Sequence, residues 1–306
     1  MSRVGIVCGG SGSSKFVRAI SKSDASSDLG FIANVGDNFW YHDLYVCPDV
    51  DILTYALAGK LDTEKGWGVR SDTFVVKEAL TELDPSQSWF SLGDRDLALS
   101  LRRTELMKQG KKLSEITKQF CDILGIKDKV VPATDDSVQT YLVTSSGRMH
   151  LQEYWVKLHG QPKVRKVDYS GLKKARPNKQ LREYLSSKVI ICPANPITSI
   201  SPTIGLMGVQ SLLKKAKVVA VSPFIGNRAF SGPAGNLMTE LGMEPTSFGV
   251  AKLYSKFLKV LFVDDLEEKS IITKISDLGI ECVKTNTAIT DDSIGQRIAE
   301  ELLSAI

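Results

Sequence analysis

The sequence has few histidines, and its cysteines lack the spacing of a metal site or a disulfide framework. Its 306 residues include three histidines and five cysteines, and no two cysteines form a Cys-x-x-Cys pair. Structural zinc sites and small disulfide-rich domains both need such spacing, so both classes are excluded. We interpret the cysteines as buried structural residues. No histidine accompanies a nucleophile-elbow motif, so a covalent triad is not indicated either.

The sequence also lacks long apolar segments. No run approaches the ~20 residues that a membrane-spanning helix needs, and the N-terminus has no signal-peptide pattern. With 42% hydrophobic and 24% charged residues, the chain has the composition of a globular protein. Its length suffices for one large domain or about two average ones. We therefore expect a cytoplasmic protein with no membrane partner.

Positive charge is missing from one stretch of the chain and concentrated in another. Between Lys22 and Lys60 there are six aspartates and no Lys or Arg, which gives −6, whereas residues 157–188 hold ten Lys/Arg against two acids, which gives +8. Clustered carboxylates without basic neighbours gain from a divalent cation. A basic stretch that contains no nucleic-acid motif is usually a solvated face. The charge pattern therefore favours magnesium in the acidic stretch and no nucleic-acid partner.

The pattern of apolar runs predicts an α/β protein with a mainly parallel sheet, because continuous apolar strands that alternate with helices are typical of sheets covered on both faces. The expected strands are 3–8, 31–35, 189–192, 218–221 and 260–263, and the expected helices include 71–83, 97–108, 113–124 and 291–306. A β-hairpin is expected around 145–147. We predict a three-layer α/β/α Rossmann-like core from residues 1–60 and 187–306. Residues 61–186 would form an inserted smaller domain of helices and a short antiparallel β element.

The glycine-rich turn at 9–15 is a candidate phosphate site. It reads Gly-Gly-Ser-Gly-Ser-Ser-Lys and joins the first expected strand to a helix. It is neither a Walker A loop nor a full dinucleotide fingerprint, because Lys15 stands where the third glycine of the fingerprint would fall. Backbone amides at a helix N-terminus suit phosphate. A tight structural turn explains the glycines almost as well.

Acidic residues follow the early expected strands, at the edge of the sheet where such folds bind ligands. Asp37 ends the segment Asn-Val-Gly-Asp, and Asp49 and Asp51 form an Asp-x-Asp pair. Such a pair can cap a helix, but the absence of basic neighbours favours a magnesium ion. The acids at 93–96 and 134–136 could equally be helix caps or strand ends. The chemistry indicated is magnesium plus phosphate, which acts by positioning and charge neutralisation.

Together these motifs resemble the 2-phospho-L-lactate transferase family of coenzyme F420 biosynthesis, the CofD family. The segments that carry the resemblance are 9–12 (Gly-Gly-Ser-Gly), 34–37 (Asn-Val-Gly-Asp), 48–51 (Pro-Asp-Val-Asp), 66–68 (Gly-Trp-Gly), 89–96 (Trp-Phe-Ser-Leu-Gly-Asp-Arg-Asp), 195–199 (Asn-Pro-Ile-Thr-Ser) and 232–234 (Gly-Pro-Ala). The likeness covers nearly the whole chain. It implies a Rossmann-like core with an inserted smaller domain, a requirement for Mg²⁺ and a homodimer.

The resemblance also implies a reaction. A lactyl-2-diphospho-5′-guanosine donor, or its phosphoenolpyruvyl counterpart, would transfer its phosphorylated acid to the ribityl hydroxyl of Fo (7,8-didemethyl-8-hydroxy-5-deazariboflavin). The products would be F420-0 and GMP. The hydroxyl would attack the phosphorus nearest the organic acid, in line with the leaving GMP.

The resemblance also implies which residues contact each part of the two substrates. The acceptor contacts would be Asp51 and Ser91, the diphosphate contacts Gly9, Gly10, Gly12 and Lys15, and the guanosine-side contacts Asn195 and Ser199. Asp51 would orient or deprotonate the acceptor hydroxyl, while magnesium with Lys15 or Arg95 would stabilise the developing charge.

The metal ligands implied by the resemblance are Asp37, Asp49 and Asp51. In this chain Asn38 replaces an acid that is usual in the family, which removes one possible ligand. We therefore rank Asp49 and Asp51 above Asp37. Ser13 and Ala194 are two further departures from the family pattern, and they affect the donor side.

The alternative function is that of a non-catalytic regulatory protein of related fold that binds a UDP-sugar. It shares the glycine-rich start but lacks the segments that stand here at 48–51 and 89–96. These segments favour the transferase.

Overall fold

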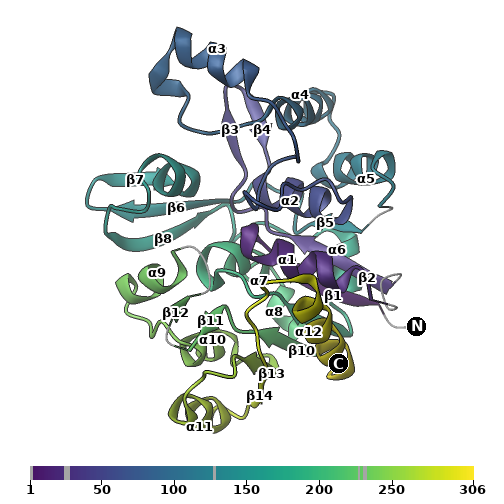
Figure 1. The fold of residues 1–306 in the computed structure, drawn as a ribbon, viewed down its shortest axis with the longest axis vertical. Helices are drawn as coiled ribbons and strands as arrows, with labels where there is room; N and C mark the ends of the chain where they lie inside the picture. Colours follow the sequence, from purple (N-terminus) through teal and green to yellow (C-terminus); the bar gives the residue numbers. More distant parts are fainter. Residues whose placement is uncertain (1–2, 24–27, 127–128, 227, 230–232) are drawn as a thin grey trace.

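A seven-stranded, all-parallel sheet forms the centre of the molecule (Figure 1). The structure is a computed structural model that describes residues 3–23, 28–126, 129–226, 228–229 and 233–306, with Gln87 described by its backbone alone. Along the sheet the strands are β14 (Glu281–Lys284), β13 (Leu258–Val263), β10 (Lys217–Val221), β9 (Lys188–Ile191), β1 (Val4–Cys8), β2 (Leu29–Ala33) and β5 (Val130–Pro132). The predicted Rossmann-like α/β fold is confirmed.

The order of the strands places a topological switch point in the middle of the sheet. From β1 the chain moves to β2 and then β5 on one side, and it later returns to β9 on the other side of β1. Connections therefore leave β1 and β9 in opposite directions, and a crevice opens where they part. The loops that follow β1 and β9 begin at Gly9 and Cys192, so the glycine-rich turn and the 195–199 segment flank this crevice.

Helices cover both faces of the sheet. Figure 1 shows α1 (Gly10–Ile20) and α12 (Asp292–Ser304) side by side in front of the strands, with α6 (Lys179–Tyr184) behind them. A side chain at Gly5 or Gly30 would collide with Tyr184 of α6, so the glycines let α6 approach the sheet. The remaining helices are α2 (Pro48–Leu57), α3 (Val75–Leu83), α4 (Asp94–Lys108), α5 (Leu113–Ile123), α7 (Ser201–Ile204), α8 (Val209–Leu213), α9 (Ala234–Glu240), α10 (Ser247–Tyr254) and α11 (Lys269–Asp277).

Three small antiparallel sheets complete the fold. They contain β3 (Phe39–Tyr41) with β4 (Leu44–Val46), β6 (Gln139–Thr144) with β7 (Gly147–His150) and β8 (Val164–Ser170), and β11 (Phe224–Ile225) with β12 (Arg228–Ala229). The expected hairpin around 145–147 is present, but its second strand ends at His150 because residues 153–157 form a π-helical turn. Within the described residues no helix is both long and apolar enough to cross a membrane.

The segment 61–186 contributes to the central sheet as well as to the smaller elements. Its strand β5 pairs in parallel with β2, and its helix α6 packs against β1 and β5. Three residues are too few for an apolar run to reveal β5 in the sequence. The division into a core of 1–60 and 187–306 and an insertion of 61–186 stays a prediction.

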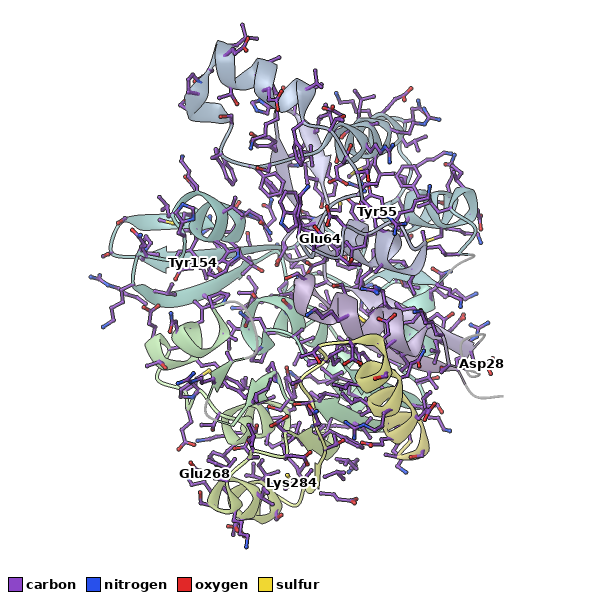
Figure 2. All side chains as sticks on the ribbon, viewed as in Figure 1. Asp28, Tyr55, Glu64, Tyr154, Glu268 and Lys284 are labelled. Atoms are coloured by element: carbon purple, nitrogen blue, oxygen red, sulfur yellow. The ribbon has the colours of Figure 1, made fainter. Side chains whose placement is uncertain are left out.

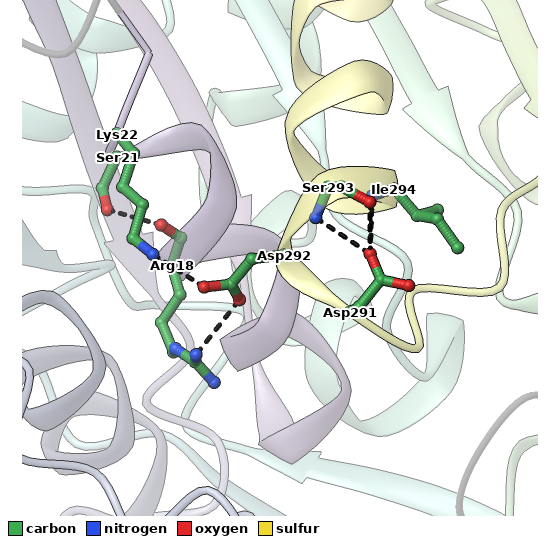
Figure 3. A network of polar contacts seen from close by, with 7 residues as sticks. All are labelled: Arg18, Ser21, Lys22, Asp291, Asp292, Ser293 and Ile294. Carbon is green, nitrogen blue, oxygen red and sulfur yellow. Dashed lines mark hydrogen bonds and ion pairs between the residues drawn. The ribbon is translucent and has the colours of Figure 1, made fainter.

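The C-terminal helix α12 packs against α1, the helix that begins at the glycine-rich turn. Asp292 at the start of α12 forms ion pairs with Arg18 (3.1 Å) and Lys22 (2.7 Å) of α1, while Asp291 caps α12 (Figure 3). Closer to the core, Gly295 lies so near α1 that an added Cβ would stand 2.6 Å from the Cβ of Ala19. Packing and ion pairing therefore both join α12 to α1.

We expect the packing of α12 against α1 to contribute more to the free energy of unfolding than the ion pairs between them. Gly295→Val should lower the free energy of unfolding by roughly 1–3 kcal/mol, because the added carbons force the two helices apart. Asp292→Asn removes only half-exposed ion pairs and should cost less than about 1 kcal/mol. Urea denaturation of both variants checks the order, and an equal or larger effect of Asp292→Asn would show that the ion pairs hold α12 in place.

Candidate functional site

A cavity of about 440 Å³ lies at the switch point, between the central sheet and the segments around α2. Its wall comes from the loops after β1, β2 and β9, from α2, and from residues 67–68, 90–92 and 151–156. Nine of the predicted site residues line it: Gly9, Gly10, Gly12, Asp37, Asp49, Asp51, Ser91, Asn195 and Ser199. The fold thus gathers residues that lie nearly 190 positions apart in the chain.

The glycine-rich turn is held close to the loop that follows β9. A Cβ at Gly9 would stand 2.8 Å from the Cβ and the carbonyl oxygen of Ser199, and Gly10 has a φ of +68°. Ser13 donates to the Gly9 carbonyl oxygen at 2.8 Å, and its Oγ accepts from the Gly9 amide at 3.0 Å. Glycine is therefore required at 9, and the departure at Ser13 serves to fix the turn. Gly10, Ser11 and Gly12 at the start of α1 line the cavity, and the N-terminus of a helix suits an anion.

Asn195 lines the cavity, and Asn34 is buried beside the lining residues Asp37 and Asp49. The Asn195 Oδ1 accepts from the amides of Ile197 and Thr198, which leaves its buried Nδ2 without a hydrogen-bond partner in the described structure. Because a buried donor without a partner is costly, Nδ2 is suited to a ligand oxygen. Asn34, by contrast, is fully engaged.

Asn34 joins two buried carboxylates. Its Nδ2 donates to Asp37 at 3.0 Å and to Asp49 at 2.9 Å. The amide of Gly10 also donates to Asp49, which ties the acid to the glycine-rich turn. Burial raises the pKa of Asp49 to about 6, and burial together with the charge of Asp49 raises the pKa of Asp37 well above its usual range. The groups that lower these two pKa values again are the amides of Asn34 and Gly10, not cations.

The pair Asp37 and Asp49 fits a hard divalent cation. Two carboxylates without a cationic neighbour are oxygen ligands of the kind that Mg²⁺ prefers. Within the described residues no group of three or more His, Cys, Asp and Glu is arranged to hold a metal ion. A magnesium ion here would therefore take its other ligands from water and from substrate phosphate, which is its usual habit in phosphoryl-transfer sites.

Asp51 has a different partner. It forms an ion pair with the guanidinium of Arg103, a side chain that is only 1% exposed, and Arg103 also donates to the Tyr45 carbonyl oxygen at 3.1 Å. Burial raises the pKa of Asp51, and the charge and hydrogen bond of Arg103 oppose that shift. Since a carboxylate paired with a guanidinium is already neutralised, Asp51 is less suited than Asp37 and Asp49 to hold a metal.

Part of the cavity lining is apolar and aromatic. Trp67, Phe90 and Trp155 line it together with aliphatic residues, and Ser91 lies beside Phe90. The Ser91 hydroxyl accepts a hydrogen bond from the Lys77 ammonium at 2.7 Å. Flat aromatic walls with a few polar groups suit a planar heterocycle. The lining therefore combines amides and carboxylates, which suit phosphate and a metal ion, with aromatic rings, which suit a planar group.

Two predicted residues lie outside this arrangement. The side chains of Lys15 and Arg95 are exposed and do not line the cavity, although both belong to segments that do. Arg95 follows Asp94 at the first turn of α4, where its backbone amide donates to Asp72. The proposed role of Lys15 or Arg95 in charge stabilisation therefore stays a prediction.

Several site residues were not found from the sequence. Arg103 stands in an ordinary helical stretch, and neither Tyr55 nor Trp155 belongs to a motif that carries the family resemblance. Tyr55 follows Asp51 by four positions on α2, so a helical projection of the Asp-x-Asp motif would have placed both side chains on one face. No comparable signal exists for Arg103.

Comparison with known proteins gives a consistent result. The sequence profile of the family described as "2-phospho-L-lactate transferase CofD" matches residues 4–299. Relatives named 2-phospho-L-lactate transferase include the protein of Methanococcoides burtonii, which is 38% identical over 98% of this chain and 98% of its own. That of Methanosarcina mazei is 36% identical over 98% and 99% of the two chains. That of Methanocaldococcus jannaschii is 37% identical over 97% and 96%.

Among solved structures, a member of the UPF0052 family from Bacillus halodurans is similar over 99% of this chain and 98% of its own, with a TM-score of 0.65. Its sequence identity is 14%, so this likeness concerns the fold alone.

Proposed function

Because the chain belongs to the CofD family of 2-phospho-L-lactate transferases, we propose that it transfers a 2-phospholactyl or phosphoenolpyruvyl group from a guanosine-diphosphate-linked donor to the ribityl hydroxyl of Fo. F420-0 and GMP are the products. The single observation that carries the proposal is the cavity lining, which combines amides and paired carboxylates with aromatic rings. Family membership makes the chain a transferase, which disfavours the UDP-sugar-binding regulator.

The donor occupies the end formed by the glycine-rich turn. The amides at the start of α1 face its diphosphate, and the free Nδ2 of Asn195 donates to a phosphate or ribose oxygen. Ser199 lies against Gly9 and Gly10, which places its hydroxyl on the guanosine side. Gly12 in the first turn of α1 leaves room for the phosphates to approach the backbone.

Asp37 and Asp49 would hold the magnesium ion that the family is expected to require. When bound, the ion would neutralise charge on the donor phosphates and favour departure of GMP. Asn34 keeps both carboxylates in place by donating to each of them. This assignment favours Asp37 with Asp49 over Asp51, which Arg103 already neutralises.

The acceptor ring lies at the aromatic end, between the faces of Trp67, Phe90 and Trp155. Ser91, oriented by Lys77, contacts the ring system. The ribityl chain then runs toward Asp51, which accepts a hydrogen bond from the terminal hydroxyl and orients its oxygen toward phosphorus. A bond forms from that oxygen to the phosphorus nearest the organic acid, and the bond from this phosphorus to the bridging oxygen breaks. The bridging oxygen leaves as part of GMP.

An assay with defined substrates tests this proposal. The protein is incubated with Fo, Mg²⁺ and either the lactyl or the phosphoenolpyruvyl guanosine diphosphate, and the deazaflavin product is identified by mass. We expect one donor to give the corresponding F420-0 species, and chelation of Mg²⁺ to abolish it. Unchanged Fo with both donors would contradict the proposal. The homodimer implied by the family stays a prediction.

A further inference from the structure

A second acidic residue, Asp96, stands behind Asp51 in the wall of the cavity. It comes from the first turn of α4 and is 9% exposed. The Tyr55 hydroxyl donates a hydrogen bond to its carboxylate, and the buried Oδ1 has no hydrogen-bond partner within the described structure. Tyr55 itself lines the cavity (Figure 2 labels it on α2). Asp96 and Tyr55 therefore both line the cavity, and the hydrogen bond couples the phenol to the carboxylate.

Tyr55 shares the cavity wall with Asp51 and Trp67. It stands four positions after Asp51 on α2, which is about one helical turn, or roughly 5 to 6 Å along the helix. Toward the other side it adjoins the loop at 66–68, whose glycines have φ values of +76° and +72° and place Trp67 in the cavity wall. A Cβ at Gly68 would stand 3.4 Å from Asp96 Oδ2, so this loop closes over Asp96.

The surroundings of Asp51 and Asp96 give the two carboxylates different tasks. Asp51 is held by its buried ion pair with Arg103, whereas the buried Oδ1 of Asp96 has no hydrogen-bond partner within the described structure. Protonation of Asp96 would relieve the burial of a charge and its repulsion by Asp51 and Asp72, the groups that raise its pKa to about 7. Tyr55 and Arg103 are the other groups that face Asp96, and both oppose this shift. Environments that separate two carboxylates in this way mark an orienting group and a proton acceptor.

We propose that Tyr55 and Asp96 form a proton relay that takes the proton of the acceptor hydroxyl, while Asp51 orients that hydroxyl. The inference rests on the proposed transfer to Fo. As the acceptor oxygen bonds to phosphorus, its proton moves to the Tyr55 oxygen and the Tyr55 proton moves to Asp96. GMP leaves with the electron pair of the broken P–O bond, and Asp96 returns its proton to water after product release.

The protonation of Tyr55 requires the two transfers to be concerted. Burial and the charges of Asp51 and Asp96 raise the pKa of Tyr55 far above its ordinary value. A free tyrosinate is thus inaccessible, and Tyr55 can accept a proton only while it gives one to Asp96. Tyr55 without Asp96 is then useless as an acceptor.

The test compares Asp96→Asn, Tyr55→Phe, the double variant and the control Glu105→Gln. Glu105 lies on the same helix but is exposed and paired with Arg102. For the wild type we expect kcat to rise with pH through an apparent pKa near 7. Each relay variant should lose roughly 10²–10³-fold in kcat with little change in the KM for Fo, and should lose this rise. The double variant should be no slower than either single one.

Two results would overturn the relay: Asp96→Asn and Tyr55→Phe within a few-fold of wild-type kcat, or losses that multiply in the double variant. Circular dichroism and Fo binding confirm that each variant is folded. If Asp96→Asn does not fold, Tyr55→Phe alone tests the relay. A wild-type protein that fails to convert Fo would instead refute the proposed function. The two failures are therefore distinguishable.

Discussion

Replacement of Arg103 by methionine is expected to lower kcat/KM for the transfer by at least roughly 100-fold and to destabilise the protein by about 3–5 kcal/mol. The reason for the second effect is that Arg103→Met leaves Asp51 as a buried carboxylate without its partner, and removal of one member of a buried ion pair is strongly destabilising. The reason for the first is that Asp51 then neutralises by taking up a proton and loses the orientation that Arg103 gives it.

The control for Arg103→Met is the adjacent residue. Arg102→Met removes a guanidinium from the same helix, but Arg102 and its partner Glu105 are both about half exposed. Exposed pairs of this kind contribute at most about 1 kcal/mol, so Arg102→Met should leave stability and turnover nearly unchanged. Comparable losses in the two variants would mean that α4 tolerates no change of charge, rather than that Arg103 serves Asp51.

A double variant separates the two effects of Arg103→Met. Adding Asp51→Asn removes the unpaired charge and should restore most of the lost free energy of unfolding, because the amide has nearly the shape of the carboxylate. It should not restore turnover, since the orienting carboxylate is gone. Urea denaturation and initial rates measure the two quantities, and recovery of activity together with stability would contradict the role of Asp51.

The second large effect is expected from Asp49→Asn, which should lower kcat by roughly 100-fold or more while it stabilises the ligand-free protein at pH 8. Asp49 is buried with a pKa of about 6, above the value of about 3.9 for an unfolded chain. Its contribution to stability is therefore complete below pH ~4 and is lost as the pH rises through 6. The asparagine carries no charge and avoids a loss of roughly 2–3 kcal/mol.

Asp49→Asn should lower activity although it raises stability, because the carboxylate of Asp49 is one of the two proposed to bind magnesium. The variant should need a much higher Mg²⁺ concentration for half-maximal rate. Thermal melting at pH 5 and pH 8, with a magnesium titration of the rate, tests both statements. A variant less stable than wild type at pH 8, with an unchanged magnesium requirement, would show that Asp49 is a structural residue held by Asn34 and Gly10.

Much of this architecture could be predicted because the local sequence encodes it. A buried β-branched strand followed by a glycine turn and a helix places Gly9 at a sheet edge, and parallel pairing brings the loops after β1, β2 and β9 to that same edge. Asp37, Asp49 and Asn195 therefore meet in the cavity as expected. The family motifs add Ser91 and the aromatic segment around it.

What could not be predicted depends on which face of a helix is buried and on contacts between distant segments. Arg102 and Arg103 are adjacent and chemically identical, yet one is exposed and the other is buried against Asp51, 52 residues away. Lys15 and Arg95 stand in the right segments but face outward. Strand β5 is too short for an apolar run to mark it, so the sheet has an edge strand that pattern analysis assigned to the insertion.

One cavity is expected to bind both substrates and to join them. A single reaction with Fo, the guanosine-diphosphate-linked donor and Mg²⁺, in which GMP and F420-0 are quantified together over time, tests it most directly. We predict that GMP and F420-0 appear in equal amounts, and that GMP release stops when Fo is omitted. Release of GMP without Fo, or in large excess over F420-0, would identify a donor hydrolase and contradict the account.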